Sequence, residues 1–386
     1  MRISQLYTYP IKSLRPTALS DAWVTRQGFQ YDRRFMLLKW VPDEEEEKEE
    51  EKKKKKPKNM HISHIPEMGL FQTDIIFPTD HTPGTLVVTY HPPTNKTGQE
   101  DAGAKDNVTS NDRRIEIPLE PDVDELGASA GITVEIHGSP TRAYDMGQLY
   151  NDWFSRWFGY DVVLAYLGEN GRRVLGTFSP RLSSAHRQPS SSSSSSSSSY
   201  SAFGLLSKVA GRIPYLGWDN GGEDEDERIT FADCAPYLVV SETSLHDVTG
   251  RIGTGEVMDV TKFRPNIVIS GAETAWEEDF WGELAIGDQQ GGDSTRLLLT
   301  ANCVRCTSIN VDYATGKAGQ GESGKILKKL MKDRRVDKGA KYSPVFGRYA
   351  FLSKESNGDF VRVGDEVTVP WLIAERTTYD WPGLTN

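Results

Sequence analysis

Short runs of alternating apolar and polar residues fill the first part of the chain, over residues 1–145. Successive side chains of a strand point to opposite faces, so this alternation indicates strands that bury one face. Turn-forming residues separate the runs. We therefore predict an antiparallel barrel or sandwich built from Ile3–Tyr9, Ala22–Arg26, Phe35–Val41, Leu70–Phe77, Thr85–Tyr90, Arg114–Pro118 and Ile132–His137.

The period of the apolar pattern changes over residues 147–158. Leu149, Trp153 and Trp157 recur every four residues there, which is the spacing of one helix face. We predict an amphipathic helix whose aromatic side chains pack in the core rather than bind a cofactor. A strand is expected directly afterwards, at Asp161–Tyr166.

A second β-rich half runs from Ile229 to about Val369. Helical spacing interrupts it at Ser241–Arg251 and Lys325–Arg334, and a serine followed by an apolar run is typical of a capped helix start. Four polar segments lie between the regular patterns, and their composition buries too little apolar surface to offset the entropy lost on ordering. We expect them to be solvated insertions: 43–58, 98–112, 184–201 and 219–228.

The formal net charge of −10 says little about partners. Asp219–Arg228 holds six acidic residues and one basic residue, so half of the excess negative charge lies in one expected loop. The lysine run at 52–56 adjoins glutamates that neutralise it, and we expect no nucleic-acid binding. No stretch approaches the ~20 apolar residues that span a bilayer. The sequence favours a soluble, cytoplasmic protein, with mitochondrial association left open.

The three cysteines are too few for a disulfide framework, which favours a reducing compartment. Two of them, Cys303 and Cys306, form the sharpest local signal, in CVRC. Such a pair serves half of a zinc site, a thioredoxin-type redox pair or one thiolate of a larger metal site. Two buried structural cysteines are the alternative that the motif alone leaves open.

Zinc needs about four nitrogen or sulfur ligands, and no second pair of this kind completes the set. The flanking segments Arg296–Ala301 and Thr307–Asp312 alternate like strands, so no helix N-terminus is expected to lower a thiol pKa. Arg305 would instead favour a thiolate electrostatically, and a soft thiolate suits a soft metal.

Two clusters supply groups for an anionic ligand. Arg264 and Asn266 belong to FRPN, where the guanidinium can fork onto a phosphate and the amide can both donate and accept. Taken alone, an arginine that pairs a nearby acid is the better interpretation of that cluster. Lys12 and Ser13 directly follow a strand-like segment, Arg33 follows a glycine-containing turn, and all three suit an anion as well.

Six strings occur in one order along the chain: YPIKSL, YDRRFML, FRPNIVISG, EEDFWGELAIGD, CVRCTSINVDYATG and SPVFGRY. This ordered set resembles proteins that carry an N-terminal MOSC β-barrel followed by a MOSC domain, a family that includes the mitochondrial amidoxime-reducing component. The resemblance implies a β-rich α+β fold with peripheral helices. Its expected parts are an N-terminal β-barrel-like domain at 1–145, a helical connector with disordered serine-rich and acidic insertions at 146–228, and a MOSC β-barrel domain at 229–375.

The resemblance also implies a molybdenum cofactor, with the metal held by a pyranopterin. Cys306 then resembles the protein ligand of the metal and the catalytic residue, and Arg305 a neighbour of the cofactor. The residues that resemble the groups holding the pterin and its phosphate are Lys12, Ser13, Arg33, Arg264, Asn266 and Tyr349. Cys234 and Ala235 stand where relatives often carry hydroxyl residues, and His64 stands near the place of an arginine.

The implied activity is a two-electron reduction of N-hydroxylated or related N-oxygenated small molecules. Electrons are expected from a separate protein of the cytochrome b5, ferredoxin or flavin-reductase type. The rival hypothesis is a carrier that binds molybdenum cofactor or sulfur without turning over a substrate. Pyridoxal phosphate on Lys12 is a weaker alternative. We expect Cys303 to be a buried thiol beside the site rather than a catalytic group.

Overall fold

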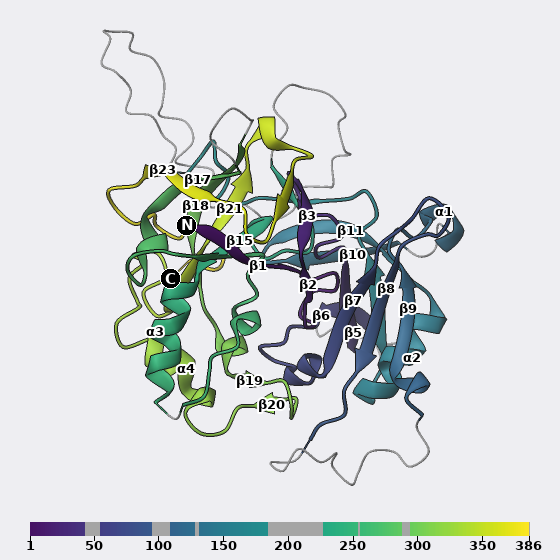
Figure 1. Cartoon of the computed structure of the whole chain (residues 1–386). Helices are drawn as coiled ribbons and strands as arrows, with labels where there is room; N and C mark the ends of the chain where they lie inside the picture. The colour runs from purple at the N-terminus through teal and green to yellow at the C-terminus, as the bar shows by residue number, and fades with distance from the viewer. Residues whose placement is uncertain are drawn as a thin grey trace, which may run out of the picture.

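Strands dominate the computed structural model, and the helices are short and lie at the periphery (Figure 1). This confirms the expected β-rich α+β class. The helices are α1 (Val123–Leu126), α2 (Gln148–Phe158), α3 (Glu242–Ile252) and α4 (Ile326–Leu330). The structure describes residues 1–42, 55–94, 109–127, 131–183, 227–253, 255–287 and 294–385.

The largest sheet has eight strands and combines both ends of the chain. The first strand pairs antiparallel with a strand more than 260 residues later, Ile3 opposite Ile269 and Leu6 opposite Ile267. Only β15 and β16 run parallel in this sheet. Its spatial order is β2 (Thr17–Leu19), β1 (Arg2–Thr8), β16 (Ile267–Ser270), β15 (Tyr237–Ser241), β21 (Val345–Leu352), β18 (Thr295–Val304), β17 (Trp281–Ile286) and β23 (Val367–Leu372).

Two further antiparallel sheets form the other half of the molecule, on the right of Figure 1. One has the order β10 (Gly131–Ile136), β11 (Ser139–Asp145), β12 (Val162–Tyr166), β5 (Phe35–Pro42) and β6 (Lys55–Asn59). The other is β7 (Phe71–Ile76), β8 (Thr85–Tyr90) and β9 (Arg114–Pro118). Helix α2 packs aromatic side chains against them, and Phe154 is fully buried beside Phe71. The predicted core face was wrong at its first position, because Leu149 is 71% exposed.

Short pieces connect these sheets. They are β3 (Asp21–Thr25) with β4 (Gly28–Phe29) and β22 (Phe360–Arg362), β13 (Arg172–Arg173) with β14 (Arg228–Ile229), and β19 (Val311–Asp312) with β20 (Lys317–Ala318). Single 3₁₀ turns occur at η2 (Pro66–Leu70), η3 (Asn111–Arg113), η5 (Val260–Phe263), η6 (Glu277–Phe280), η7 (Thr307–Asn310), η8 (Ser323–Lys325) and η9 (Lys354–Ser356).

Several sequence expectations were wrong in detail. The insertion expected at 43–58 ends in a strand, because Lys55–Asn59 pairs with β5 at the edge of its sheet, where charged lysines are tolerated. Thr307–Asp312 is a 3₁₀ turn followed by a two-residue strand. The helix expected at Lys325–Arg334 is regular only over its first half. Ser241 precedes α3, but its hydroxyl makes no capping bond and is buried without a partner among the described residues.

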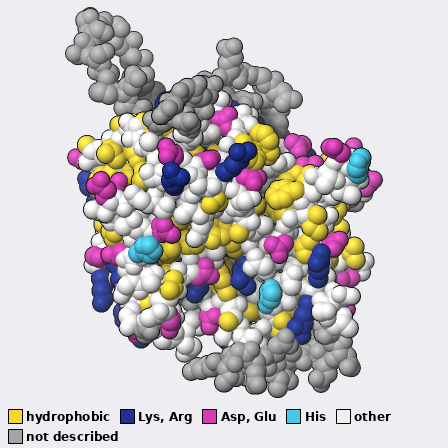
Figure 2. All heavy atoms as spheres, in the orientation of Figure 1, with side chains coloured by type: hydrophobic (Ala, Val, Ile, Leu, Met, Phe, Trp, Pro, Cys, Tyr) yellow, Lys and Arg dark blue, Asp and Glu magenta, His cyan; other side chains and the backbone are white. Residues whose placement is uncertain are grey.

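The expected insertions at 98–112, 184–201 and 219–228 fall almost wholly outside the described residues. The division of the chain at residues 145 and 228 stays a prediction, and the sheets cross it, since β1 joins the C-terminal strands and β12 joins β5. In the described part of the chain, no helix combines the length and the apolar character that a bilayer requires. Figure 2 shows acidic and basic side chains interspersed over the face it draws.

Candidate cofactor site

A hollow opens where the C-terminal end of β18 meets the segments that precede β15, β16 and β5. The volume open to a water-sized sphere is about 70 Å³, and the space free of protein atoms is about 510 Å³ when the solvent at the mouth is included. Segments that are 200 to 300 residues apart in the sequence therefore meet at one place. Six of the eight residues singled out from the sequence line this hollow: Arg33, Arg264, Asn266, Arg305, Cys306 and Tyr349.

The two cysteines of CVRC have different surroundings. Cys303 lies in β18, is 2% exposed and accepts a hydrogen bond from Arg305 Nη1 at 2.6 Å. Burial raises the pKa of the Cys303 thiol, and Arg305 opposes the rise. Cys306 follows the end of the strand, is exposed, and has its Sγ 3.2 Å from Ser308 Oγ. Of these two thiols, Cys306 is the one that an incoming ligand can reach.

Arginines from both halves of the chain surround the hollow. Arg33 and Arg264 both adopt left-handed backbone conformations and stack on the ring of Tyr9, at 4.8 and 4.4 Å from its centre. Arg33 pairs with the buried carboxylate of Asp32. Arg264 Nη1 donates to the Leu14 carbonyl at 2.9 Å, whereas its Nη2 is buried with no partner among the described residues. A buried guanidinium with a free N–H group is suited to an anionic oxygen.

Lys12 and Ser13 do not line the hollow. Lys12 is buried, donates to the Phe231 carbonyl at 2.8 Å and pairs with the carboxylate of Asp233, which does line the hollow. Burial lowers the pKa of Lys12, and Asp233 opposes the change. Ser13 is buried in a left-handed turn. Pyridoxal phosphate binding by Lys12 is not confirmed, because its ammonium group is already engaged.

The Asn266 side chain lines the hollow but already has protein partners. Its Oδ1 accepts from the backbone N–H of Leu238 and from Arg33 Nη1, each at 3.2 Å, and its Nδ2 donates to the Tyr7 carbonyl at 3.2 Å. Asn266 thus connects β15, β1 and Arg33 through these hydrogen bonds. Tyr349 lies in β21 and is 8% exposed.

Sequence reasoning missed a histidine cluster at the edge of the site. His137 Nε2 lies 3.5 Å from Asp233 Oδ1, and the His137 ring stacks on His61 at 6.1 Å between ring centres. His64 contacts His61 edge to face, and the intervening Ser63 carbonyl accepts from Thr307 Oγ1, next to Cys306. His61 and His64 lie three residues apart in one segment, whereas His137 comes from a separate loop, so no spacing in the sequence relates His137 to the other two.

Lys12 and His137 determine the charge of Asp233. Burial alone raises the pKa of this carboxyl group, but the Lys12 ammonium and the hydrogen bond from His137 hold it well below its usual range. His61 is also affected, since burial and the nearby Lys12 lower its pKa to about 4. Within the described residues, no group of three or more His, Cys, Asp or Glu side chains is arranged to hold a metal ion by itself.

Comparison with known protein families agrees with this arrangement. The MOSC N-terminal beta barrel domain matches residues 1–161, and the MOSC domain matches residues 226–368. The chain belongs to the MOSC-domain family. Both halves of this MOSC protein contribute to the hollow, since Arg33 lies in the first match and Arg264, Arg305 and Cys306 lie in the second.

Individual relatives support a molybdenum-cofactor-related function at the level of the family. Rat mitochondrial amidoxime reducing component 2 is 35% identical over 162 residues, which is 42% of this MOSC protein and 44% of the relative. Human mitochondrial amidoxime-reducing component 1 is 37% identical over 142 residues, 36% of this chain and 39% of the relative. Tomato molybdenum cofactor sulfurase is 28% identical over 153 residues, 37% of this chain and 18% of the relative. The matches span less than half of each relative.

Proposed function

We propose that this MOSC protein is a molybdenum-cofactor-dependent reductase of N-hydroxylated or related N-oxygenated small molecules. A separate electron-transfer protein supplies its electrons. The observation that supports the proposal is the meeting of one exposed thiol, Cys306, with arginines from both halves of the chain in a single hollow. The amidoxime-reducing relatives named above motivate the choice of substrate class.

The residues present suit a molybdenum pyranopterin. The Cys306 thiol is a soft donor for the metal. Arg264 and Arg305 each keep one buried N–H group without a partner in the described structure, and such groups fit the phosphate and the pterin oxygens. Lys12 and Arg33 are paired with Asp233 and Asp32, so they help to position the lining and add little net charge. Asn266 holds Arg33 and the backbone of Leu238 in place through its hydrogen bonds. Tyr349 lines the hollow together with Cys303.

The bound cofactor supplies the two-electron redox chemistry, and the protein must supply protons. Reduction of an N-hydroxyl group takes up two electrons and two protons and releases one water. Asp233 lies in the hollow, and His137 Nε2 is 3.5 Å from its carboxylate. Because the Asp233 carboxylate stays ionised, we infer that it orients the His137 imidazole and that this imidazole passes protons to the departing oxygen. Cys303 is too buried to contact substrate and instead positions Arg305.

The carrier hypothesis remains the alternative because the sulfurase relative also contains a matching region. A carrier would hold cofactor on the same residues and show no turnover. The experiment that separates the two begins with purified protein assayed for molybdenum by mass spectrometry and for pterin by fluorescence. Reduction of benzamidoxime is then followed with a chemical reductant in place of the electron donor.

About one molybdenum and one pterin per chain, with turnover to benzamidine, is the result expected of a reductase. Molybdenum and pterin without any turnover would replace the reductase by the carrier. Zinc without pterin would refute cofactor binding altogether. Asp233→Asn is the variant that tests proton delivery, with Asp74→Asn on β7 as a matched control outside the hollow. The first should lower turnover and change its pH profile, and the second should do neither.

A further inference from the structure

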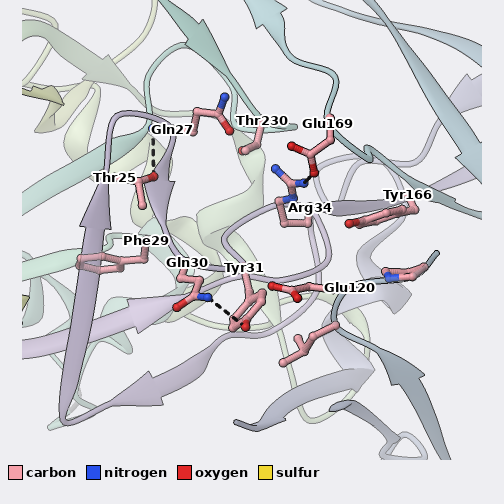
Figure 3. Close-up of a pocket in the computed structure, with 12 residues that line it drawn as sticks. Thr25, Gln27, Phe29, Gln30, Tyr31, Arg34, Glu120, Tyr166, Glu169 and Thr230 are labelled. Carbon is pink, nitrogen blue, oxygen red and sulfur yellow. Dashed lines mark hydrogen bonds and ion pairs between the residues drawn. The ribbon is translucent and has the colours of Figure 1, made fainter. Parts of the chain in front are cut away.

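A second cavity of about 460 Å³ lies where β3, β4, β9, β12 and β14 meet (Figure 3). Its volume falls within the range of small-molecule sites. No residue lines both this cavity and the hollow at Cys306, although the two share a wall. Arg33 faces the hollow, the next residue Arg34 faces the cavity, and Phe231 N donates to the Arg33 carbonyl at 3.0 Å.

Three aromatic residues form part of the lining of the cavity, among polar ones. Phe29, Tyr31 and Tyr166 are 3%, 6% and 4% exposed, and all three line it. Figure 3 shows the Tyr31 side chain beside Glu120, with Arg34 near Glu169. Aromatic faces of this kind favour an apolar body or a cation, because the ring faces carry partial negative charge.

The charges in the cavity leave one carboxylate for a ligand. Arg34 already donates to the Gly168 carbonyl and lies 3.7 Å from Glu169 Oε1. Glu120, in contrast, has no cation paired with it among the described residues. Gln30 Nε2 donates to the Tyr31 hydroxyl at 3.0 Å, and Figure 3 draws the exposed Glu120 carboxylate beside that hydroxyl, with lone pairs left for a ligand.

An independent observation also indicates a ligand. Thr230 lines the cavity and is only 2% exposed, yet its hydroxyl has no hydrogen-bond partner in the described structure. A buried hydroxyl without a partner is unfavourable, because it has lost its hydrogen bonds to water. Figure 3 draws Thr230 and Glu120 on different sides of the cavity. The cavity thus offers an anion on one side, a hydroxyl on another and aromatic rings between them.

We propose that this cavity binds a small aromatic amine whose ammonium group pairs with Glu120 and whose far polar end meets Thr230. The site is distinct from the molybdenum site, and it does not depend on the proposed reductase activity. Tyramine has this arrangement of groups and is the probe. The matched comparison is 3-(4-hydroxyphenyl)propionate, which replaces the ammonium group by a carboxylate.

Ligand-observed NMR titration of the full chain measures the binding of each compound. We expect tyramine to bind with a Kd on the order of 1 mM, as suits a ligand of this size, and the propionate not to bind. Glu120→Gln should weaken tyramine about threefold to tenfold, and Thr230→Val about threefold. Glu116→Gln, an exposed acid of β9 outside the lining, is the matched control and should leave the Kd unchanged.

Three results would overturn the proposal. These are no binding of tyramine up to about 10 mM, equal binding of the propionate, or tyramine binding that is unchanged in Glu120→Gln. The last result would place the ligand elsewhere, including the hollow at Cys306, because Glu120 is not part of that lining. The melting temperature of each variant shows whether it is folded, and Thr230→Val provides the test if Glu120→Gln is not.

Discussion

Exchanging each thiol of CVRC for a hydroxyl separates metal binding from stability. Cys306→Ser replaces an exposed thiol, so the unfolding free energy of the cofactor-free protein should change by less than about 0.5 kcal/mol. Molybdenum should lose its protein ligand, because a serine hydroxyl is hard and stays protonated. Activity should fall by more than about 100-fold, since even residues that only orient a metal ligand contribute about 10- to 100-fold.

Cys303→Ser should act in the opposite way. This side chain is 2% exposed and its sulfur accepts from Arg305 Nη1, so a smaller and more polar atom leaves a gap and a weakened bond. We expect a loss of about 1–3 kcal/mol. For a chain of 386 residues, the unfolding entropy converts this loss into a fall in Tm of about 1–4 °C. Molybdenum should be retained and activity only partly reduced.

The assay compares both variants with wild type by molybdenum content, pterin fluorescence, Tm and benzamidoxime reduction with a chemical reductant. Ser308→Ala is the control for Cys306, because it removes the hydroxyl 3.2 Å from the thiol and keeps the proposed ligand. It should retain both metal and turnover. An inactive Cys303→Ser together with an active Cys306→Ser would refute the assignment of the ligand.

Three other predictions concern stability. Replacing 43–54 and 184–201 by short Gly/Ser linkers should leave Tm within about 2 °C, whereas extending the first replacement through Lys55–Asn59 removes an edge strand and should lower Tm clearly. Asp279→Asn should destabilise the protein by about 3–5 kcal/mol in denaturant unfolding, because a fully buried carboxylate that pairs two arginines is lost. The lowered pKa of His61 means that the unfolded chain binds more protons between about pH 6.5 and 4, so stability should fall as pH drops through that window, and His61→Gln should flatten this dependence. An unchanged pH dependence in that variant would argue against a buried, neutral His61.

The alternation of apolar residues predicted strand positions well in the sheet whose neighbouring strands are also consecutive in the sequence. Thr85–Tyr90 and Arg114–Pro118 are strands with the predicted bounds. The strand at Ser139–Asp145 was missed because Pro140 and the polar residues around it hide a pattern of burial that does alternate. Which sheet a strand joins is decided by distant partners, and periodicity carries no information about them. The membership of β1 in the C-terminal sheet is therefore visible only in the structure.

The sequence indicated the lining of the site better than the role of each side chain. Chemically suitable residues in ordered motifs led to six residues that do meet. The motif could not show that Asp233 neutralises Lys12, or that the side chain of Asn266 already has hydrogen-bond partners within the protein. Those facts depend on which groups become neighbours after folding. The same holds for the contact between His137 and Asp233.

The pairing of β1 with β16 means that the largest sheet cannot be completed until late in synthesis of the chain. Ile3 leaves the ribosome early, and its partner Ile269 follows 266 residues later. At ordinary rates of translation the edge of β1 that β16 covers waits on the order of ten to fifty seconds unpaired, while β2 can pair with the other edge early. Arg33 waits almost as long for Arg264 and longer for Cys306. The nascent chain therefore contains only parts of the hollow until Cys306 has been made, and binding of the proposed cofactor would follow synthesis of both halves. A chaperone that shields this strand would act during that interval.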